Sequence, residues 1–150
     1  MDIKLRDYVD ADYNEFLEMV GSLYSEDLEG QPMNNAKIDS TINECKKNPQ
    51  KVRIIIFLND HDLIGYSILV YYWSNEYGGD ILFVDELYVK KDYRSRGVGA
   101  HFLSYIEKMD NIVAIQLEAN SSNKIVVNYY TRLGFEMVDN TQLIKTCTSS

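Results

Sequence analysis

The sequence is poor in the residues that mark disulfide-rich and membrane-spanning proteins. It contains two cysteines and two prolines among 150 residues. Cys45 and Cys147 lack the spacing of metal ligands, and so small a number of cysteines suits a reducing compartment. No stretch approaches the roughly 18 consecutive apolar residues of a membrane span. We therefore expect no disulfide framework, no metal site and no membrane partner.

Positive charge is also scarce. Lys and Arg number 15 against 23 Asp and Glu, which gives a formal net charge of -8. A protein that binds nucleic acids needs a basic face to displace counterions from phosphates, so we expect no nucleic-acid partner. The N-terminal sequence MDIKLRDYVDADY lacks the basic start and apolar stretch of a signal peptide. These features predict a cytoplasmic protein.

The remaining composition is that of an ordinary globular protein. Hydrophobic residues make up 45% of the chain and charged residues 25%. A chain of this length suits one domain, which would bury roughly 70% of the surface that its unfolded form exposes. We expect residues 1–150 to form a single domain with a substantial core.

The hydrophobic pattern predicts a mixed α+β fold. Strands are expected at 2–8, 52–58, 63–73, 80–90 and 113–119, with a last strand or hairpin at 135–145, and helices within 10–28 and at 37–47, 97–109 and 122–133. The order, βααβββαβαβ, joins a mostly antiparallel first half to βαβ crossovers. It predicts a sheet with helices on both faces.

One segment gathers positive charge in spite of the acidic whole. VKKDYRSRGVGAHFL, residues 89–103, has four cations in the seven positions from Lys90 to Arg96, and glycines at 97 and 99. A helix that opens at Gly97 leaves its first amides without partners, and Arg94 and Arg96 add positive charge to that end. Glycine lets a phosphate approach the backbone closely. The segment thus favours a site for a diphosphate.

Two other phosphate-binding motifs could contain such a segment. A dinucleotide-binding loop requires a third glycine where this chain has Phe102, and a P-loop requires a Gly-Lys-Ser/Thr sequence that is absent. Both fit poorly. A tight loop whose cations are simply solvated remains an alternative if the segment is considered alone.

A second motif makes the pattern specific. In NKIVVNYYTRLGFE, residues 123–136, Asn123 lies seven residues before Tyr130, and the sequence LGF follows. Together with the strand DELYV and the loop YRSRGVG, this helix resembles the GNAT superfamily of N-acetyltransferases in order and spacing. The similarity covers most of the chain. It implies a central, twisted, mostly antiparallel sheet with helices on both faces.

The resemblance implies that acetyl-CoA binds as co-substrate, without a metal. The cofactor would lie in an opening between the strands that hold Leu87 and Leu117, with its pantetheine arm paired to the backbone of the first. The amides from Arg96 to Ala100 would bind the diphosphate. The implied cofactor residues are Leu87, Tyr88, Val89, Arg94, Ser95, Arg96, Gly97, Val98, Gly99, Ala100, Asn123 and Tyr130.

Three residues are candidates for the chemistry of acetyl transfer. By resemblance Tyr130, four residues before Gly134, would protonate the departing thiolate, although a packing role for this tyrosine is the alternative. Asp85 would remove a proton from the amine, and Glu86 would contact the substrate. Alternation along a strand points these two carboxylates to opposite faces unless a bulge intervenes. A purely structural role for either carboxylate also stays open.

The acceptor is expected to be a primary amine that attacks acetyl-CoA directly in a ternary complex. The strand and the sequence before it are similar to diamine and polyamine acetyltransferases, which implies a small cationic amine. The resemblance to the GNAT family also implies a homodimer, because homodimers are frequent in that family. Where those proteins carry an acid before the strand, this chain has Asn75. A peptide or protein amine, or a CoA-binding sensor without turnover, are alternatives. The candidate acceptor contacts are Glu26, Asp27, Glu29, Asn75, Asp80 and Glu86.

Overall fold

The computed structural model describes residues 1–26 and 30–147, so the candidate contacts Asp27 and Glu29 lie outside the described residues. The chain forms two compact units, Met1–Glu118 and Ala119–Ser150, and each is described by itself. The single domain expected over residues 1–150 stays a prediction. Among the described helices, none combines the length and hydropathy that a membrane span requires.

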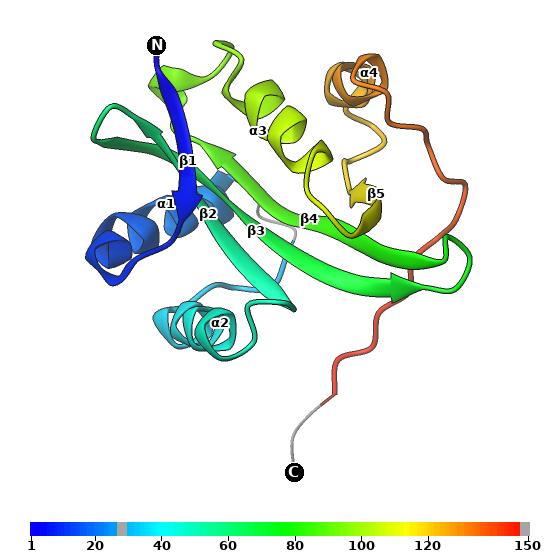
Figure 1. The fold of residues 1–150 in the computed structure, drawn as a ribbon, viewed down its shortest axis with the longest axis horizontal. Helices are drawn as coiled ribbons and strands as arrows, with labels where there is room; N and C mark the ends of the chain where they lie inside the picture. The colour runs from blue at the N-terminus through cyan, green and yellow to red at the C-terminus, as the bar shows by residue number, and fades with distance from the viewer. Residues whose placement is uncertain (27–29, 148–150) are drawn as a thin grey trace. The chain divides into compact units, whose positions relative to one another are not determined.

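The first unit is built on a five-stranded sheet in the order β1-β2-β3-β4-β5 (Figure 1). Its strands are β1 (Ile3–Asp7), β2 (Val52–Asn59), β3 (Asp62–Ser74), β4 (Gly79–Val89) and β5 (Ile112–Leu117). Neighbouring strands are antiparallel from β1 to β4, and β4 and β5 are parallel. This confirms the mixed, mostly antiparallel sheet.

Helices cover both faces of this sheet (Figure 1). The helices α1 (Tyr13–Glu26) and α2 (Asn35–Lys47) lie on one face, and α3 (Val98–Glu107) lies on the other. Short 3-10 turns, η1 (Asp10–Asp12) and η2 (Lys91–Tyr93), precede α1 and α3. The side chain of Asn34 accepts a hydrogen bond from the Lys37 amide at 2.9 Å. This cap starts α2 two residues earlier than its periodicity predicted.

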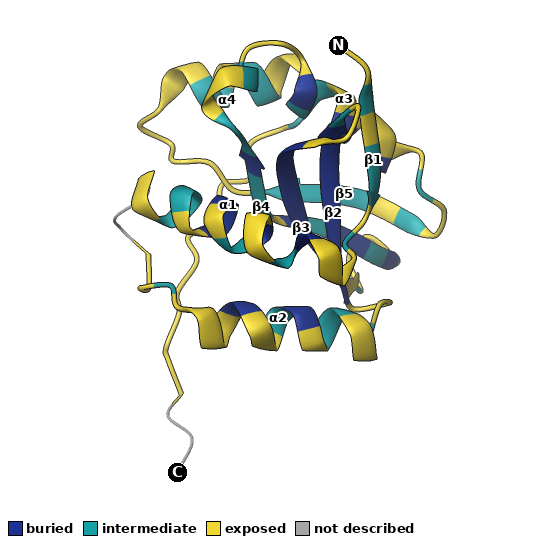
Figure 2. Ribbon diagram, turned by 90° about the vertical axis from the view of Figure 1, so that its left-hand side faces the viewer, coloured by how far each residue is buried: buried dark blue, intermediate teal, exposed yellow. Residues whose placement is uncertain are grey.

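The core is made by apolar side chains of the middle strands and of the helix faces turned to them (Figure 2). Towards α1 and α2, Phe16 packs edge-on against Tyr66, with ring centroids 5.1 Å apart. Towards α3, the rings of Phe57 and Phe102 lie 4.9 Å apart. Because β2 and β3 are apolar on both faces, they read as nearly continuous hydrophobic runs in the sequence.

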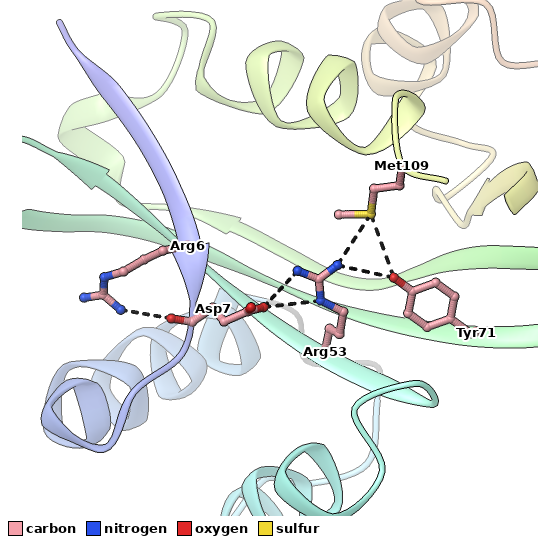
Figure 3. Close-up of polar contacts among 5 residues, drawn as sticks. All are labelled: Arg6, Asp7, Arg53, Tyr71 and Met109. Atoms are coloured by element: carbon pink, nitrogen blue, oxygen red, sulfur yellow. Dashed lines mark hydrogen bonds and ion pairs between the residues drawn. The ribbon is translucent and has the colours of Figure 1, made fainter. Parts of the chain in front are cut away.

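A polar cluster ties the end of α3 to the sheet (Figure 3). Arg53 of β2 binds the Asp7 carboxylate at 2.9 Å. Its guanidinium also donates to the hydroxyl of Tyr71 at 3.5 Å and to the sulfur of Met109 at 3.7 Å. One arginine thus joins β1, β2 and β3 to the turn between α3 and β5.

The second unit contains α4 (Lys124–Arg132), which Asn123 caps by accepting from the Val126 amide at 3.3 Å. Gly134, with φ of +98°, ends it in the left-handed conformation that favours glycine. The strand predicted for 135–145 is wrong, because the described residues from 135 to 147 form neither helix nor strand. A β-rich composition favours a strand only where a partner strand supplies hydrogen bonds, and this unit has none among its described residues.

Candidate active site

A β-bulge in β4 decides where the adjacent carboxylates point. Ile68 of β3 pairs with Glu86, whereas the next residue, Leu69, pairs with Val84, so Asp85 is the extra residue. Such a bulge interrupts the alternation of side chains. The Glu86 carboxylate contacts Tyr24 of α1, and Asp85 lines a hollow beside α2. Both carboxylates therefore lie on the face that α1 and α2 cover, as the sequence analysis allowed only with a bulge.

Glu86 is held by two phenols and a serine. The hydroxyls of Tyr24 and Tyr66 donate to its carboxylate at 2.5 and 2.7 Å. The Ser67 hydroxyl donates to its backbone carbonyl at 2.8 Å. Tyr66 and Ser67 are fully buried, and burial together with the Glu86 charge raises the pKa of the Tyr66 phenol far above its ordinary value. These contacts fix the bulge, and they favour a positioning role for Glu86.

Asp85 has a different environment. Asp85 is exposed to solvent, but neighbouring protein atoms partly desolvate its carboxylate. This desolvation raises the pKa of Asp85, and the negative charges of Glu86 and Glu118 act in the same direction. A carboxylate with a raised pKa is a stronger base, so of the two acids Asp85 is the better suited to accept a proton.

The sheet opens next to this bulge. The parallel pairing of β4 with β5 begins at Asp80. Among the described residues it ends at Val84, which pairs with Leu117. On the other side, β4 stays paired with β3 as far as Val89. The backbone groups of Leu87 and the amide of Val89 that face the β5 side can therefore bind an extended ligand as an added strand, whereas the Val89 carbonyl already accepts from Arg94. Leu87, Tyr88 and Val89 are the predicted pantetheine contacts.

The glycine loop joins β4 to α3 through two left-handed residues. Ser95 has φ of +62° and Gly97 has φ of +84°. The first hydrogen bond of α3 runs from the His101 amide to the Gly97 carbonyl at 2.9 Å. The amides of Val98, Gly99 and Ala100 precede this bond and have no partner within the helix. Three such donors at a helix N-terminus suit an anionic group such as a diphosphate.

The two arginines of the loop differ in their contacts. Arg94 donates to the Val89 carbonyl at 2.7 Å and forms a two-pronged ion pair with Glu26 at 2.9 and 3.0 Å. It is therefore engaged with α1 and β4. Arg96 is exposed and lies over the ring of Tyr93, 5.8 Å from its centroid. Of the predicted cationic contacts, Arg96 is thus better placed to meet a solvent-borne anion.

The predicted acceptor contacts do not form one group. Two of them lie near the end of α1. Glu26 is its last residue and binds Arg94, and Glu86 accepts a hydrogen bond from Tyr24 of that helix. Asp80 pairs with Trp73, and Asn75 lies in the turn between β3 and β4. Six residues of strand, about 20 Å, separate Asp80 from Glu86. A small amine cannot reach both ends of β4 at once.

Sequence reasoning missed the residues that hold the bulge and those that surround Asp85. Tyr24 is 62 residues from Glu86 and Tyr66 is 20 residues away, so no local spacing connects them. The hollow at Asp85 also receives side chains from α2, among them Ser40, Thr41 and Glu44. Only strand pairing and helix packing bring these segments together.

In the second unit, the motif tyrosine is packed among aromatic rings. The ring centroid of Tyr130 lies 5.3 Å from that of Tyr129 and 5.8 Å from that of Phe135. Burial raises the pKa of Tyr130, and the neighbouring phenol of Tyr129 adds to the shift. The Tyr130 hydroxyl therefore stays protonated at neutral pH, as a proton donor requires. Within the described residues, no group of three or more His, Cys, Asp or Glu could hold a metal.

Comparisons with known proteins support one family. Residues 14–135 match the model of the acetyltransferase (GNAT) family. No curated protein matches the sequence. Many solved structures share the fold, at identities too low to show more than the fold itself.

Three of these structures resemble this chain over nearly its whole length. A possible acetyltransferase from Clostridium difficile 630 is 20% identical, with a TM-score of 0.82 over 98% of this chain and 99% of that chain. AAC(6′)-Iy, in complex with the bisubstrate analogue CoA-S-monomethyl-acetylneamine, is 15% identical, with a TM-score of 0.74 over 99% of this chain and 100% of that chain. Glucosamine-6-phosphate N-acetyltransferase from Arabidopsis thaliana is 16% identical, with a TM-score of 0.71 over 97% and 99%.

The family match spans the β4 bulge and the glycine loop of the first unit, and α4 of the second. The chain therefore belongs to the acetyltransferase (GNAT) family and is an acyltransferase that uses acetyl-CoA.

Proposed function

We propose that this protein transfers the acetyl group of acetyl-CoA to the primary amine of a small cationic molecule, by direct attack in a ternary complex. The observation that carries the proposal is the end of the β4–β5 ladder at Val84, directly before the bulge residue Asp85. A free strand edge for an extended cofactor and a carboxylate for the amine thus adjoin one another in β4.

The residues of the loop fit the cofactor. The backbone of Leu87 and the amide of Val89 would bind its pantetheine arm, and the amides of Val98, Gly99 and Ala100 would bind its diphosphate. A Cβ added at Gly97 would meet no atom within 4 Å, so the backbone there is open to a ligand. When bound, acetyl-CoA supplies the activated acetyl group.

Proton transfer falls to two side chains. An ammonium must lose a proton before its nitrogen can attack, and Asp85 would accept that proton, directly or through one water. Tyr130 would donate a proton to the departing thiolate. This assignment rests on the spacing from Asn123 to Gly134 and on a phenol that is protonated at neutral pH. Glu86 orients the bulge through Tyr24 and Tyr66.

An amine panel tests the proposal. Release of free thiol from acetyl-CoA is measured with alkyl monoamines, α,ω-diamines, amino sugars and a lysine-containing peptide as acceptors. We expect turnover with small cationic amines to exceed that with the peptide. Preference for the peptide would move the assignment to a protein acetyltransferase. Tight acetyl-CoA binding without turnover on any amine would identify a sensor instead.

The predicted homodimer and cytoplasmic location remain predictions. Light scattering coupled to gel filtration measures the oligomeric state directly, and a mass of 17.4 kDa in solution would contradict the dimer.

A further inference from the structure

The surface around Asp85 contains a hollow that the proposed chemistry does not account for. It lies between α2 and the strands β2, β3 and β4, and its volume is about 370 Å³. Four groups of side chains form it. Val52, Ile68 and Val70 make an apolar floor, Asp85 lies on the β4 side, Ser40, Thr41 and Glu44 lie on the α2 side, and Lys51 lies just before β2.

The two carboxylates of this hollow come from different elements. Asp85 is on β4, and Glu44 is on α2. The Asn48 amide donates to Glu44 at 2.8 Å, and Lys51 approaches the same oxygen at 3.4 Å. These partners lower the pKa of Glu44, so it is ionised at neutral pH. The hollow therefore has a carboxylate on each side of an apolar floor, and the Lys51 ammonium lies beside one of them, Glu44.

The partner of Glu44 is a weak one. The Lys51 side chain is 63% exposed, and its contact with Glu44 is long for a charge-assisted hydrogen bond. A surface ion pair of this kind contributes little stability, so a ligand cation can replace the lysine at small cost. Within the part of the chain that the structure describes, the Asp85 carboxylate has no hydrogen-bond or ion-pair partner, so it can bind a second cation.

From this arrangement we propose that the hollow is the acceptor site and that Glu44 reads a second cationic group on the acceptor. The reacting ammonium lies against Asp85, the alkyl chain lies on Val52, Ile68 and Val70, and the far ammonium or guanidinium binds Glu44. The inference rests on the proposed function for its reacting end. It adds α2 as the element that selects acceptors with two charges over acceptors with one.

Matched acceptors and variants test this selection. The kcat/KM of the enzyme is compared for α,ω-diamines of three to six carbons and for monoamines of the same length. In Glu44→Gln we expect KM for diamines to rise about 10-fold, because loss of one hydrogen bond to a charged group weakens binding by about that factor. KM for monoamines should change little. Lys51→Met should lower KM for diamines, because the competing cation is gone. Glu107→Gln, on α3, is the control and should match the parent.

The outcomes separate this inference from the proposed function. If amines are acetylated but Glu44→Gln affects diamines and monoamines equally, the selective role of Glu44 is wrong while the acetyltransferase proposal stands. If no amine is acetylated, titration calorimetry with the diamines decides. If the diamines bind, and if Glu44→Gln weakens that binding while Glu107→Gln does not, the result would support the diamine site without the acetyltransferase activity. If no diamine binds, the proposed site is wrong.

Discussion

Asp85 and Glu86 are neighbours in the sequence but occupy different chemical environments. Two phenols donate to the Glu86 carboxylate, whereas Asp85 faces a solvent-accessible hollow under the influence of two further negative charges. A carboxylate that is already hydrogen-bonded on both oxygens is a poor proton acceptor. The environment of each residue thus assigns the base to Asp85 and the positioning role to Glu86.

Replacement of this base should have an effect that depends on pH. In Asp85→Asn we expect kcat/KM to fall by about 100-fold at neutral pH, the lower end of the range for a positioned base. The loss should shrink at high pH, where the amine is already deprotonated. The pH profile of kcat/KM with one good acceptor measures this. A profile identical to that of the parent would remove Asp85 from the mechanism.

The stability of the same variant serves as its control. The pKa of Asp85 is raised in the folded protein, so the charged carboxylate disfavours the native state once the pH exceeds that pKa. Asp85→Asn should therefore melt no lower than the parent at pH 7. The difference should vanish as the pH falls below the ordinary aspartate value of 3.8. A variant that melts well below the parent at pH 7 would show that its lost activity reflects unfolding.

Tyr130 can be tested by removing one oxygen atom. Tyr130→Phe keeps the ring that packs against Tyr129 and Phe135, so folding should be preserved. Turnover should fall by roughly 100-fold to 10,000-fold, with little change in the dissociation constant of acetyl-CoA. Tyr129→Phe is the matched control and should be nearly silent. Equal small effects in the two variants would refute the role of Tyr130 as the acid.

Between β4 and α3, the backbone itself forms the predicted diphosphate site. Gly97 has φ of +84°, and a Cβ there would meet no other atom, so the space is open but the conformation is unfavourable for other residues. In Gly97→Glu a carboxylate would face the three free amides of α3. We expect acetyl-CoA affinity to fall by at least about 100-fold in isothermal titration, because the charge has the wrong sign.

Gly78 provides a control for backbone strain. It also has a positive φ, of +72°, and open space at its Cβ, but it lies in the turn between β3 and β4. Gly78→Glu should lose similar stability and keep its acetyl-CoA affinity. Equal loss of affinity in both variants would mean that strain, and not the loop, explains the result.

A different glycine is required by the pairing of β3 with β4. A Cβ at Gly65 would lie 2.3 Å from the Tyr88 carbonyl oxygen and 2.9 Å from the Phe57 ring. Gly65→Ala should therefore lower the free energy of unfolding by about 3 kcal/mol, as overpacking does in a tight core. Gly21→Ala in α1, where the Cβ meets nothing within 4 Å, should instead be stabilising by about 0.5–1 kcal/mol. Urea denaturation measures both.

For the entire chain, the net charge of -8 opposes an anionic cofactor, and only the local loop favours it. Binding to the folded state alone must nonetheless raise its stability. At a concentration 100 times its dissociation constant, acetyl-CoA should add about 2.7 kcal/mol and raise Tm by roughly 5–10 °C. Differential scanning fluorimetry measures the shift. At the same concentration Gly97→Glu, with its affinity at least about 100-fold lower, should gain no more than about 0.4 kcal/mol, and a shift equal to that of the parent would place the cofactor elsewhere.

Most helices and strands, and the family, could be predicted from the sequence, because the patterns that indicate them lie within short segments. Hydrophobic periodicity located each helix and the five strands of the sheet, usually to within two residues, since period and turn chemistry depend on near neighbours. The spacing of Gly97 and Gly99 and of Asn123 and Tyr130 indicated the family that the comparison then confirmed. The strand expected at 135–145 failed because composition alone does not provide a pairing partner.

Tertiary structure decided the rest, because the deciding contacts join residues that are distant in sequence. The bulge that turns Asp85 and Glu86 to one face is a mismatch in register between β3 and β4, which neither strand encodes by itself. The partners of Glu86 and the ion pair of Arg94 with Glu26 span 20 to 68 residues. Which carboxylate is free to act as a base follows only once those partners have been brought together.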